Sequence, residues 1–392
     1  MFKISMTIVG TFTLCLIIFF LNKSNINGDN FSKIIILISL LSGVLIALKE
    51  NKKNIDLYVK KKCTHRIKFK IYTSCLIWVL SVFLSFLFYK TLNIDIYSIY
   101  FIDSLIFSPL LFIFLFFWIT YWDARQNNPE DEYYLFLKKF SFSKKFFLKY
   151  KIFILSNLIK IFFIPFIYGA INISINKIIN IDLMVLSPWN IVSFLFYYGL
   201  TCDVLIALGG YIFSSKFLNT ETLSIDSTWS GWLVCLICYP PFIIIYNYFS
   251  MQVDNYIWTD WLNKNQPLYW IWALLISLSW IMYWFSTTSF GLKFSNLSWR
   301  GLVNTGLYKY MRHPAYFSKN VYWWLHTVPF FGVMGLDMLR NFLALSFVSL
   351  IYYLRAKTEE KHLLKFKEYQ EYYTWIENNG LWAKIKKKFK IS

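Results

Sequence analysis

Long apolar runs with almost no charged residues constrain the fold of this chain more than any other feature of its sequence. Residues 71–89 and 100–121 contain one charged side chain or none. Runs of this length approach the roughly 20 residues that a helix needs to cross the hydrocarbon core of a bilayer. A soluble domain usually has about 25% charged residues, whereas this chain has 16% charged and 57% hydrophobic residues. The sequence therefore predicts an all-α, polytopic integral membrane protein.

The apolar runs, separated at helix breakers, predict about ten transmembrane helices. They cover residues 5–21, 34–48, 71–89, 98–121, 152–173, 189–213, 231–249, 267–287, 321–335 and 341–353. The second run and the last two are short, so a re-entrant or tightly packed hairpin is an alternative at the C-terminal end. No small-residue cleavage site follows the first run, which favours an uncleaved helix over a signal peptide.

The distribution of the formal net charge of +19 predicts the orientation in the membrane. Basic residues concentrate in the linkers 49–70 and 122–151 and in the tail 384–390. Short basic loops stay on the cytoplasmic side and contact anionic headgroups, and this explains the charge better than nucleic-acid binding does. The nearly neutral loops predicted to lie outside are 22–33, 90–97, 174–188 and 250–266. We therefore expect both termini in the cytoplasm, in the inner membrane of a bacterium, with no nucleic-acid partner.

Two charged residues fall inside predicted spans, where an unpaired charge is costly and often functional. Asp203 lies near the middle of one span and Lys160 within another. One interpretation is that they pair with one another or snorkel to the membrane surface. The other is that Asp203 lines a polar cavity that reaches an active site. Local sequence leaves both open.

The cysteines and histidines do not predict a metal centre. Cys235 and Cys238 form a CxxC, but they precede Pro240-Pro241 on a predicted membrane helix, which is typical of packing thiols. The four histidines are scattered and the other cysteines fall mostly inside spans, so no spacing suits a metal site.

The first of two polar motifs precedes the predicted C-terminal hairpin. Gly301 and Gly306 suit turns, and Pro314 suits the first position of a helix. Arg312 and His313 would then lie at the entrance of that helix, where backbone N–H groups also attract anions. One face of the continuing helix is expected to carry Tyr316, Asn320 and Trp323.

The second motif follows the hairpin and contains Arg355 and the pair Glu359-Glu360. At helical spacing, one stripe is expected to contain Arg355, Glu359, His362, Phe366, Tyr369 and Tyr373. Arg355 and Glu359 are positioned to pair with one another. Cations on one motif and carboxylates on the other suit a zwitterionic ligand, whose carboxylate and ammonium need opposite partners. A salt-bridge cluster that ties two helix ends together is the alternative.

These paired motifs resemble the isoprenylcysteine carboxyl methyltransferase family, and phospholipid N-methyltransferases share the same general plan. The resemblance rests on Arg312-His313-Pro314-x-Tyr316, a hairpin, and Glu359-Glu360 with Leu363, and it covers roughly residues 270–375. It implies an S-adenosylmethionine pocket at the cytoplasmic membrane face, with Arg355 nearby toward the substrate. The residues that the resemblance assigns to the cofactor pocket are Arg312, His313, Tyr316, Glu359 and Glu360.

The chain departs from the family at two positions. Ser318 stands where the family often has Gly, and Lys367 follows Phe366 where Gly is common. Neither change removes a charged group, but both affect how the last helices pack. Lys319 and Asn320 open the hairpin at headgroup depth, where they are candidates to meet an anionic acceptor, with snorkelling as the alternative.

The sequence predicts an integral membrane S-adenosylmethionine-dependent methyltransferase that acts on a lipid or lipid-anchored acceptor. O-methylation of a carboxylate or phosphate is favoured over N-methylation, and an anionic acceptor needs no general base, so His313 and His362 are expected to bind rather than to catalyse. The alternatives are an NADPH-dependent enzyme like the sterol reductases, which share an Arg-His-Pro-x-Tyr element, and a non-catalytic lipid-binding membrane protein.

Three regions are expected along the chain. They are an N-terminal multi-helix membrane region of unknown role at 1–265, a methyltransferase-like membrane domain at 266–376, and a basic cytoplasmic tail at 377–392.

Overall fold

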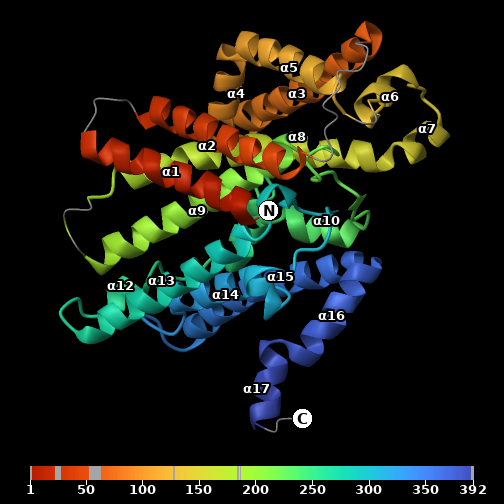
Figure 1. Cartoon of the computed structure of the whole chain (residues 1–392). Helices are drawn as coiled ribbons and strands as arrows, with labels where there is room; N and C mark the ends of the chain where they lie inside the picture. Colours follow the sequence, from red (N-terminus) through yellow and green to blue (C-terminus); the bar gives the residue numbers. More distant parts are fainter. Residues whose placement is uncertain are drawn as a thin grey trace.

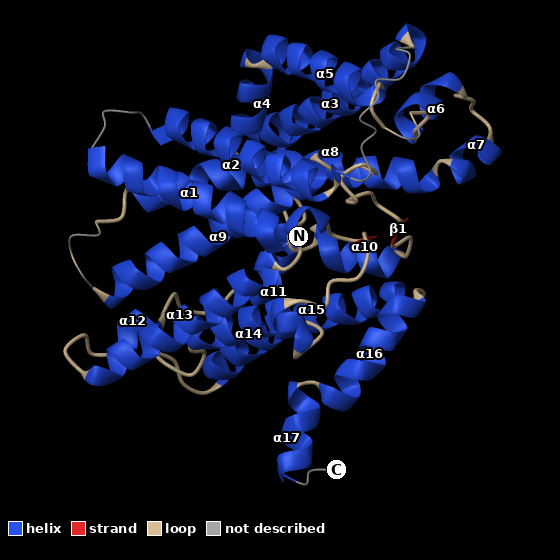
Figure 2. Cartoon of the chain, viewed as in Figure 1, coloured by secondary structure: helices blue, strands red, loops and turns tan. Residues whose placement is uncertain are grey.

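The computed structural model describes residues 2–22, 28–52, 63–126, 129–182, 185 and 187–389. Its regular structure is almost entirely helical, which confirms the predicted all-α membrane fold (Figure 1). Within the described residues, the strands are β1 (Ser224–Ile225) and β2 (Ser298–Trp299), which pair antiparallel with Ser224 opposite Trp299. Figure 2 shows how small this ladder is beside the helices. Parts of the predicted loops and linkers 22–33, 49–70, 122–151 and 174–188, and residues 390–392 of the predicted tail, lie outside the described residues.

Among the described residues, six helices are long and apolar enough to cross a membrane. They are α1 (Phe2–Asn22), α2 (Gly28–Glu50), α3 (Thr64–Leu92), α8 (Lys151–Ile179), α9 (Pro188–Ile212) and α13 (Pro267–Thr288). Helices α4 (Ile96–Ile106) and α5 (Ser108–Asp123) make a seventh span if they are taken together, although they are bent by 71°. Pro109 follows the bend, where the ring removes a backbone donor. The described chain therefore has six or seven candidate spans by length and composition, and the predicted number of about ten is not confirmed.

The predicted spans nearest the C-terminus account for the difference in number. Residues 231–249 form no single helix but fall in α10 (Trp229–Leu236) and α11 (Ile243–Ser250). Pro240 and Pro241 lie between these two helices and cannot donate the backbone hydrogen bonds of a continuous one. The predicted hairpin is α14 (Pro314–Thr327) followed by α15 (Leu336–Leu363), whose C-terminal half is rich in charged residues.

The remaining described helices are short. They are α6 (Glu132–Lys138), α7 (Lys144–Lys149), α12 (Trp258–Trp261), α16 (Lys367–Asn379), α17 (Leu381–Phe389) and the 3-10 turns η2 (Gly291–Lys293) and η3 (Gly306–Lys309). In Figure 1, α6 and α7 lie toward the same side of the molecule as the corner between α15 and α16, as their predicted cytoplasmic placement requires. The orientation in a membrane and the division into three regions stay predictions, and the boundary expected after residue 376 falls inside α16.

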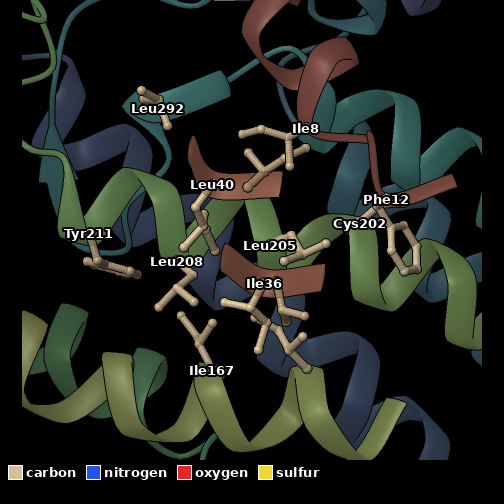
Figure 3. Packing of buried hydrophobic residues seen from close by; sticks show 14 of the residues in the cluster. Ile8, Phe12, Ile36, Leu40, Ile167, Cys202, Leu205, Leu208, Tyr211 and Leu292 are labelled. Carbon is tan, nitrogen blue, oxygen red and sulfur yellow. The ribbon is translucent and has the colours of Figure 1, made fainter. Parts of the chain in front are cut away.

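The main hydrophobic core joins the N-terminal helices to the C-terminal part of the chain. Figure 3 shows buried side chains meeting from α1 (Ile8, Phe12), α2 (Ile36, Leu40), α8 (Ile167), α9 (Cys202, Leu205, Leu208, Tyr211) and η2 (Leu292). Between membrane helices such packing stabilises through van der Waals contacts, since lipid tails are as apolar as the side chains. Helix α9 packs against α8 on one side and α13 on the other. It therefore places residues of the N-terminal region beside the two polar motifs.

Candidate functional site

A cavity of about 370 Å³, here called the site cavity, lies where α9, α13, α14 and α15 meet the segment 293–303. Its charged and ionisable lining residues include Asp203, Arg312, His313, Tyr316, Lys319, Arg355, Glu359 and His362. The structure therefore brings the two polar motifs together, and it adds a carboxyl group from α9 to them.

The first motif enters the site cavity through the local structure that the sequence predicted. Helix α14 begins at Pro314, and His313 is its N-cap residue. Gly301 and Gly306 have φ values of 94° and 59°, a region of backbone conformation that glycine adopts without steric cost. These turns place Arg312 and His313 at the entrance of α14, facing α15.

Glu360 joins the two motifs from behind the cavity wall. Its Oε1 atom lies 3.1 Å from Arg312 Nε and 3.1 Å from His313 Nε2, and its Oε2 atom lies 3.3 Å from Lys357 Nζ. Burial alone would raise the pKa of the Glu360 carboxyl. The hydrogen bond from His313 and the nearby cations together outweigh burial, so the pKa lies below its ordinary value. Glu360 is thus a charged carboxylate that fixes Arg312 and His313, and it does not itself line the cavity.

Glu359 is in a different environment from its neighbour. The Tyr316 hydroxyl donates a hydrogen bond to Glu359 Oε1, and His313 Nδ1 lies 4.0 Å from Oε2. The Glu359 side chain is 34% exposed, whereas that of Glu360 is 7% exposed. One carboxylate therefore holds the site together, and the other faces the cavity with a free side for a ligand.

The predicted stripe from Arg355 to Tyr373 is not one helix. Helix α15 ends at Leu363 and α16 begins at Lys367. Phe366 lies at this corner and stacks on Trp299 with ring centres 4.9 Å apart, so tertiary packing outweighs the local helical pattern. The corner lets Tyr373 of α16 stack on the Arg312 guanidinium at 3.9 Å.

The predicted pair between Arg355 and Glu359 is also wrong. Arg355 Nη2 donates to Asn296 Oδ1 at 3.2 Å, and its guanidinium lies 5.3 Å from the centre of the Tyr316 ring. No carboxylate of the described chain lies within ion-pair distance of Arg355, although only 6% of the residue is exposed. Glu359 is engaged by Tyr316 instead, and sequence spacing alone does not reveal Asn296 as the competing partner.

Asp203 and Lys160 do not pair with one another. The Tyr283 hydroxyl donates to Asp203 Oδ2, and Asp203 lines the site cavity. Lys160 Nζ instead lies 3.0 Å from the hydroxyl of Tyr133. The geometry therefore supports the alternative in which Asp203 reaches an active site.

The remaining predicted residues divide between the cavity and its surroundings. Lys319 lines the cavity, with its ammonium 4.3 Å from the centre of the Tyr283 ring, whereas Asn320 is not among the lining residues. His362 lines it too, and its Nε2 atom lies 3.0 Å from Ser224 Oγ. Burial lowers the pKa of His362, so the ring is neutral at pH 7 and suits a binding role.

Arg300 is a residue of the site that sequence reasoning missed. Its Nη1 atom donates to the carbonyl of Gly210 at 2.6 Å and approaches those of Leu292 and Phe294 at 3.4 Å. Burial lowers the pKa of Arg300 to about 10, so it is still charged at neutral pH. It anchors the cavity wall to α9, and no motif in the sequence marks it apart from its place ahead of Gly301.

Several buried polar atoms around the site cavity lack a partner within the described protein. They are Asp203 Oδ1, Trp280 Nε1, Ser298 Oγ, Arg300 Nε and Arg355 Nε. Buried polar atoms nearly always have partners, and leaving one unpaired costs about 1–3 kcal/mol. Five such atoms on the lining of one cavity give a polar ligand or water molecules hydrogen-bonding partners there.

Comparison with known proteins agrees with this geometry. Residues 270–365 match the isoprenylcysteine carboxyl methyltransferase (ICMT) family. No curated protein and no solved structure matches the chain. The matched segment runs from α13 to the corner after α15 and contains both polar motifs, and it covers about a quarter of the chain. The resemblance predicted from the motifs is therefore confirmed: residues 270–365 of this helical membrane protein match the model of the isoprenylcysteine carboxyl methyltransferase family.

Proposed function

We propose that this chain transfers a methyl group from S-adenosylmethionine to an anionic oxygen of a lipid or lipid-anchored acceptor. The family match supports a membrane methyltransferase that acts on lipid-like substrates. The observation that carries the finer proposal is that both motifs of the matched segment meet at one cavity with unpartnered buried polar atoms. Such a cavity suits a charged cofactor and a charged acceptor better than an apolar ligand.

The residues of the site fit the charges of S-adenosylmethionine, whose amino-acid end has both a carboxylate and an ammonium. Arg312 and His313 offer cationic or donor groups for the carboxylate, and Glu359 offers an anionic one for the ammonium. Tyr316 orients Glu359, and Glu360 acts through Arg312 and His313. When bound, the cofactor supplies a methyl group already activated on a sulfonium.

The chain then has to position the acceptor and exclude water. Arg355 and Lys319 line the cavity and are the cations that we assign to an anionic acceptor. Apolar residues Phe166, Leu200 and Val204 line the side formed by α8 and α9, where they suit a lipid tail and keep water out. Because an anionic oxygen already carries the attacking electron pair, the acceptor needs no general base, and His362 is left as a binding group.

The family match favours methyl transfer over the reductase and the non-catalytic alternatives. A nicotinamide cofactor with a phosphorylated ribose would need several free cations for its phosphates. Arg300 lines the cavity, but one of its terminal nitrogens already binds backbone carbonyls.

Transfer of a labelled methyl group tests the proposal. Purified protein in lipid–detergent micelles is incubated with methyl-labelled S-adenosylmethionine and a bacterial lipid and membrane-protein extract. Label is expected in a lipid or lipid-anchored product. A carboxyl methyl ester releases labelled methanol in mild alkali, a methyl phosphate is identified by product mass, and an N-methyl group stays attached. N-linked label would contradict O-methylation, and no labelled product at all would contradict methyl transfer.

A further inference from the structure

Asp203 is an unusual contribution of the N-terminal helices to the site cavity. Another carboxyl of that region, Asp226, also lines the cavity, but its Oδ1 atom accepts from the backbone N–H of Thr228 at 2.9 Å. The Tyr283 hydroxyl donates to Asp203 Oδ2, and the Thr287 hydroxyl also interacts with the carboxyl, but the Oδ1 atom is buried and makes no hydrogen bond of ordinary geometry in the described protein. Only 8% of the residue is exposed. The Oδ1 atom of Asp203 can therefore accept a hydrogen bond from a ligand in the cavity.

The cations that face Asp203 do not neutralise it directly. Lys319 and Arg355 are the cations that act electrostatically on the Asp203 carboxyl. No ion pair within 4.0 Å joins either of them to Asp203 among the residues that the structure describes. Arg355 also has an unpartnered buried Nε atom. An acceptor atom of Asp203 and one donor atom of Arg355, both without a hydrogen bond in the described protein, thus line one cavity.

Asp203 and Arg355 together restrict the chemistry of any ligand that forms a hydrogen bond with each of them. An anionic oxygen satisfies the Arg355 N–H group, but a simple anion leaves Asp203 unpaired and exposed to a like charge. A ligand with an N–H or O–H donor next to its anionic group satisfies Asp203 as well, so the buried polar atoms no longer carry their desolvation cost. The apolar residues Phe166, Leu200 and Val204 continue the same cavity and suit an attached lipid chain.

We propose that the methyl acceptor is an amphiphile whose carboxylate or phosphate has a neighbouring N–H or O–H donor, and that Asp203 accepts a hydrogen bond from that donor. This inference rests on the proposed function, because it assigns Arg355 and the apolar wall to the acceptor. It gives the N-terminal region a part in substrate selection, through α9. Asp203 is then a specificity-determining residue of a site that the matched segment does not complete alone.

Paired probes test the inference. Palmitate and N-palmitoylglycine both carry a carboxylate, and only the second has a neighbouring N–H group. Phosphatidylcholine and phosphatidylethanolamine both carry a phosphate, and only the second has N–H donors. Binding of each to the detergent-purified full chain is measured by calorimetry with saturating S-adenosylhomocysteine. In at least one pair, the wild type is expected to bind the donor-bearing probe about tenfold more tightly or better, as a hydrogen bond to a charged group implies.

The Asp203→Asn variant should lose this preference and bind both members of the pair within about twofold, while it keeps its affinity for S-adenosylhomocysteine. Asp103→Asn is the matched control. Asp103 is also a buried carboxyl that accepts from a tyrosine, Tyr168 at 2.8 Å, but it lines a different cavity. The control should keep both the preference and the cofactor affinity.

Equal binding of the two members of both pairs by the wild type would overturn the inference, and so would a preference that survives in Asp203→Asn. The wild-type comparison decides the matter if Asp203→Asn does not fold. Failure of the wild type to bind S-adenosylhomocysteine would instead contradict the proposed function. Cofactor binding without a donor preference removes only the inference about the acceptor.

Discussion

Two cavities of similar volume differ in how their polar side chains are paired. The site cavity measures about 370 Å³, and a second cavity of about 400 Å³ lies among α2, α3, α4, α8 and α9. In the second cavity, Asp103 accepts from Tyr168 and pairs with Lys33 at 2.8 Å, and Lys160 contacts Tyr133. None of its described lining residues has a buried polar atom without a partner, whereas several residues of the site cavity do.

The difference shows that volume alone does not identify a binding site in this molecule. A cavity whose polar groups already pair with one another offers a polar ligand little, because binding would break existing hydrogen bonds. A cavity lined by buried polar atoms without protein partners offers hydrogen bonds that a matching ligand can accept or donate. The comparison therefore favours our proposal that the chemistry takes place at the C-terminal motifs and α9, and not in the second cavity.

Glu359→Gln is the substitution expected to have the largest effect. The amide can still accept the hydrogen bond from Tyr316, but it no longer offers a charge to the ammonium of the cofactor. We expect methyl transfer to fall by about 100-fold or more, since a charge-assisted contact in a buried site is lost. Initial rates with labelled cofactor measure this. His313→Ala should also abolish transfer, and full activity in either folded variant would remove the proposed pocket.

Glu360→Gln is expected to weaken cofactor binding by about tenfold through loss of the contacts that fix Arg312 and His313. The pH dependence of the melting temperature gives a second measurement. The pKa of Glu360 lies below its ordinary value of 4.5, so its contribution to stability is complete above that pH and is lost as the pH falls through the folded-state pKa. The variant should be less stable at pH 7 and should lose less stability in acid. If the melting temperature fell equally steeply with decreasing pH in the wild type and in Glu360→Gln, this role would be contradicted.

Arg355→Lys should separate the acceptor from the cofactor. A lysine cannot reach Asn296 and also present a second donor to the cavity, as the planar guanidinium does. We expect the KM for the acceptor to rise about tenfold, with the affinity for S-adenosylhomocysteine changed less than about twofold. Arg312→Lys should show the reverse pattern. Steady-state kinetics and calorimetry on both variants test the assignment, and parallel losses in the two would argue against it.

The smallest effect is expected in the second cavity. Lys160→Met removes a contact with Tyr133 but no group of the site cavity, so transfer should change less than about twofold. Lys319→Met is the matched change in the site cavity and should raise the KM for the acceptor several-fold. The methyl-transfer rates of the two variants are measured side by side. An equal loss of rate in Lys160→Met and Lys319→Met would contradict the proposal that only the site cavity takes part in methyl transfer.

The sequence predicted the parts of this structure that depend on local pattern. Uninterrupted apolar runs became long helices, and Pro314 and the glycines at 301 and 306 produced the helix start and the turns expected of them. The division of 231–249 by Pro240 and Pro241 was missed because hydropathy was given more weight than the loss of backbone donors. The last two runs were short: the run 321–335 continues past the end of α14 at Thr327, and neither α14 nor α15 is among the candidate spans of the described chain.

The site could be predicted only as far as its motifs extend along the chain. Arg312, His313, Tyr316 and Glu359 meet as expected, because each motif is short and a hairpin returns the chain between them. The partner of Arg355 was wrong, since Asn296 lies in a segment without a motif. Asp203 was recognised as an unusual buried charge, but its place at the cavity depends on how α9 packs against α13, which no local spacing reveals.

Calorimetric titration with S-adenosylhomocysteine and, separately, with NADPH tests the central claim most directly. The detergent-purified full chain is expected to bind S-adenosylhomocysteine, to bind it at least about tenfold more weakly in Glu359→Gln, and to give no signal with NADPH. Binding of NADPH alone would contradict the methyltransferase assignment and indicate a reductase. No binding of either compound by a protein shown to be folded would contradict an enzymatic role for the site cavity.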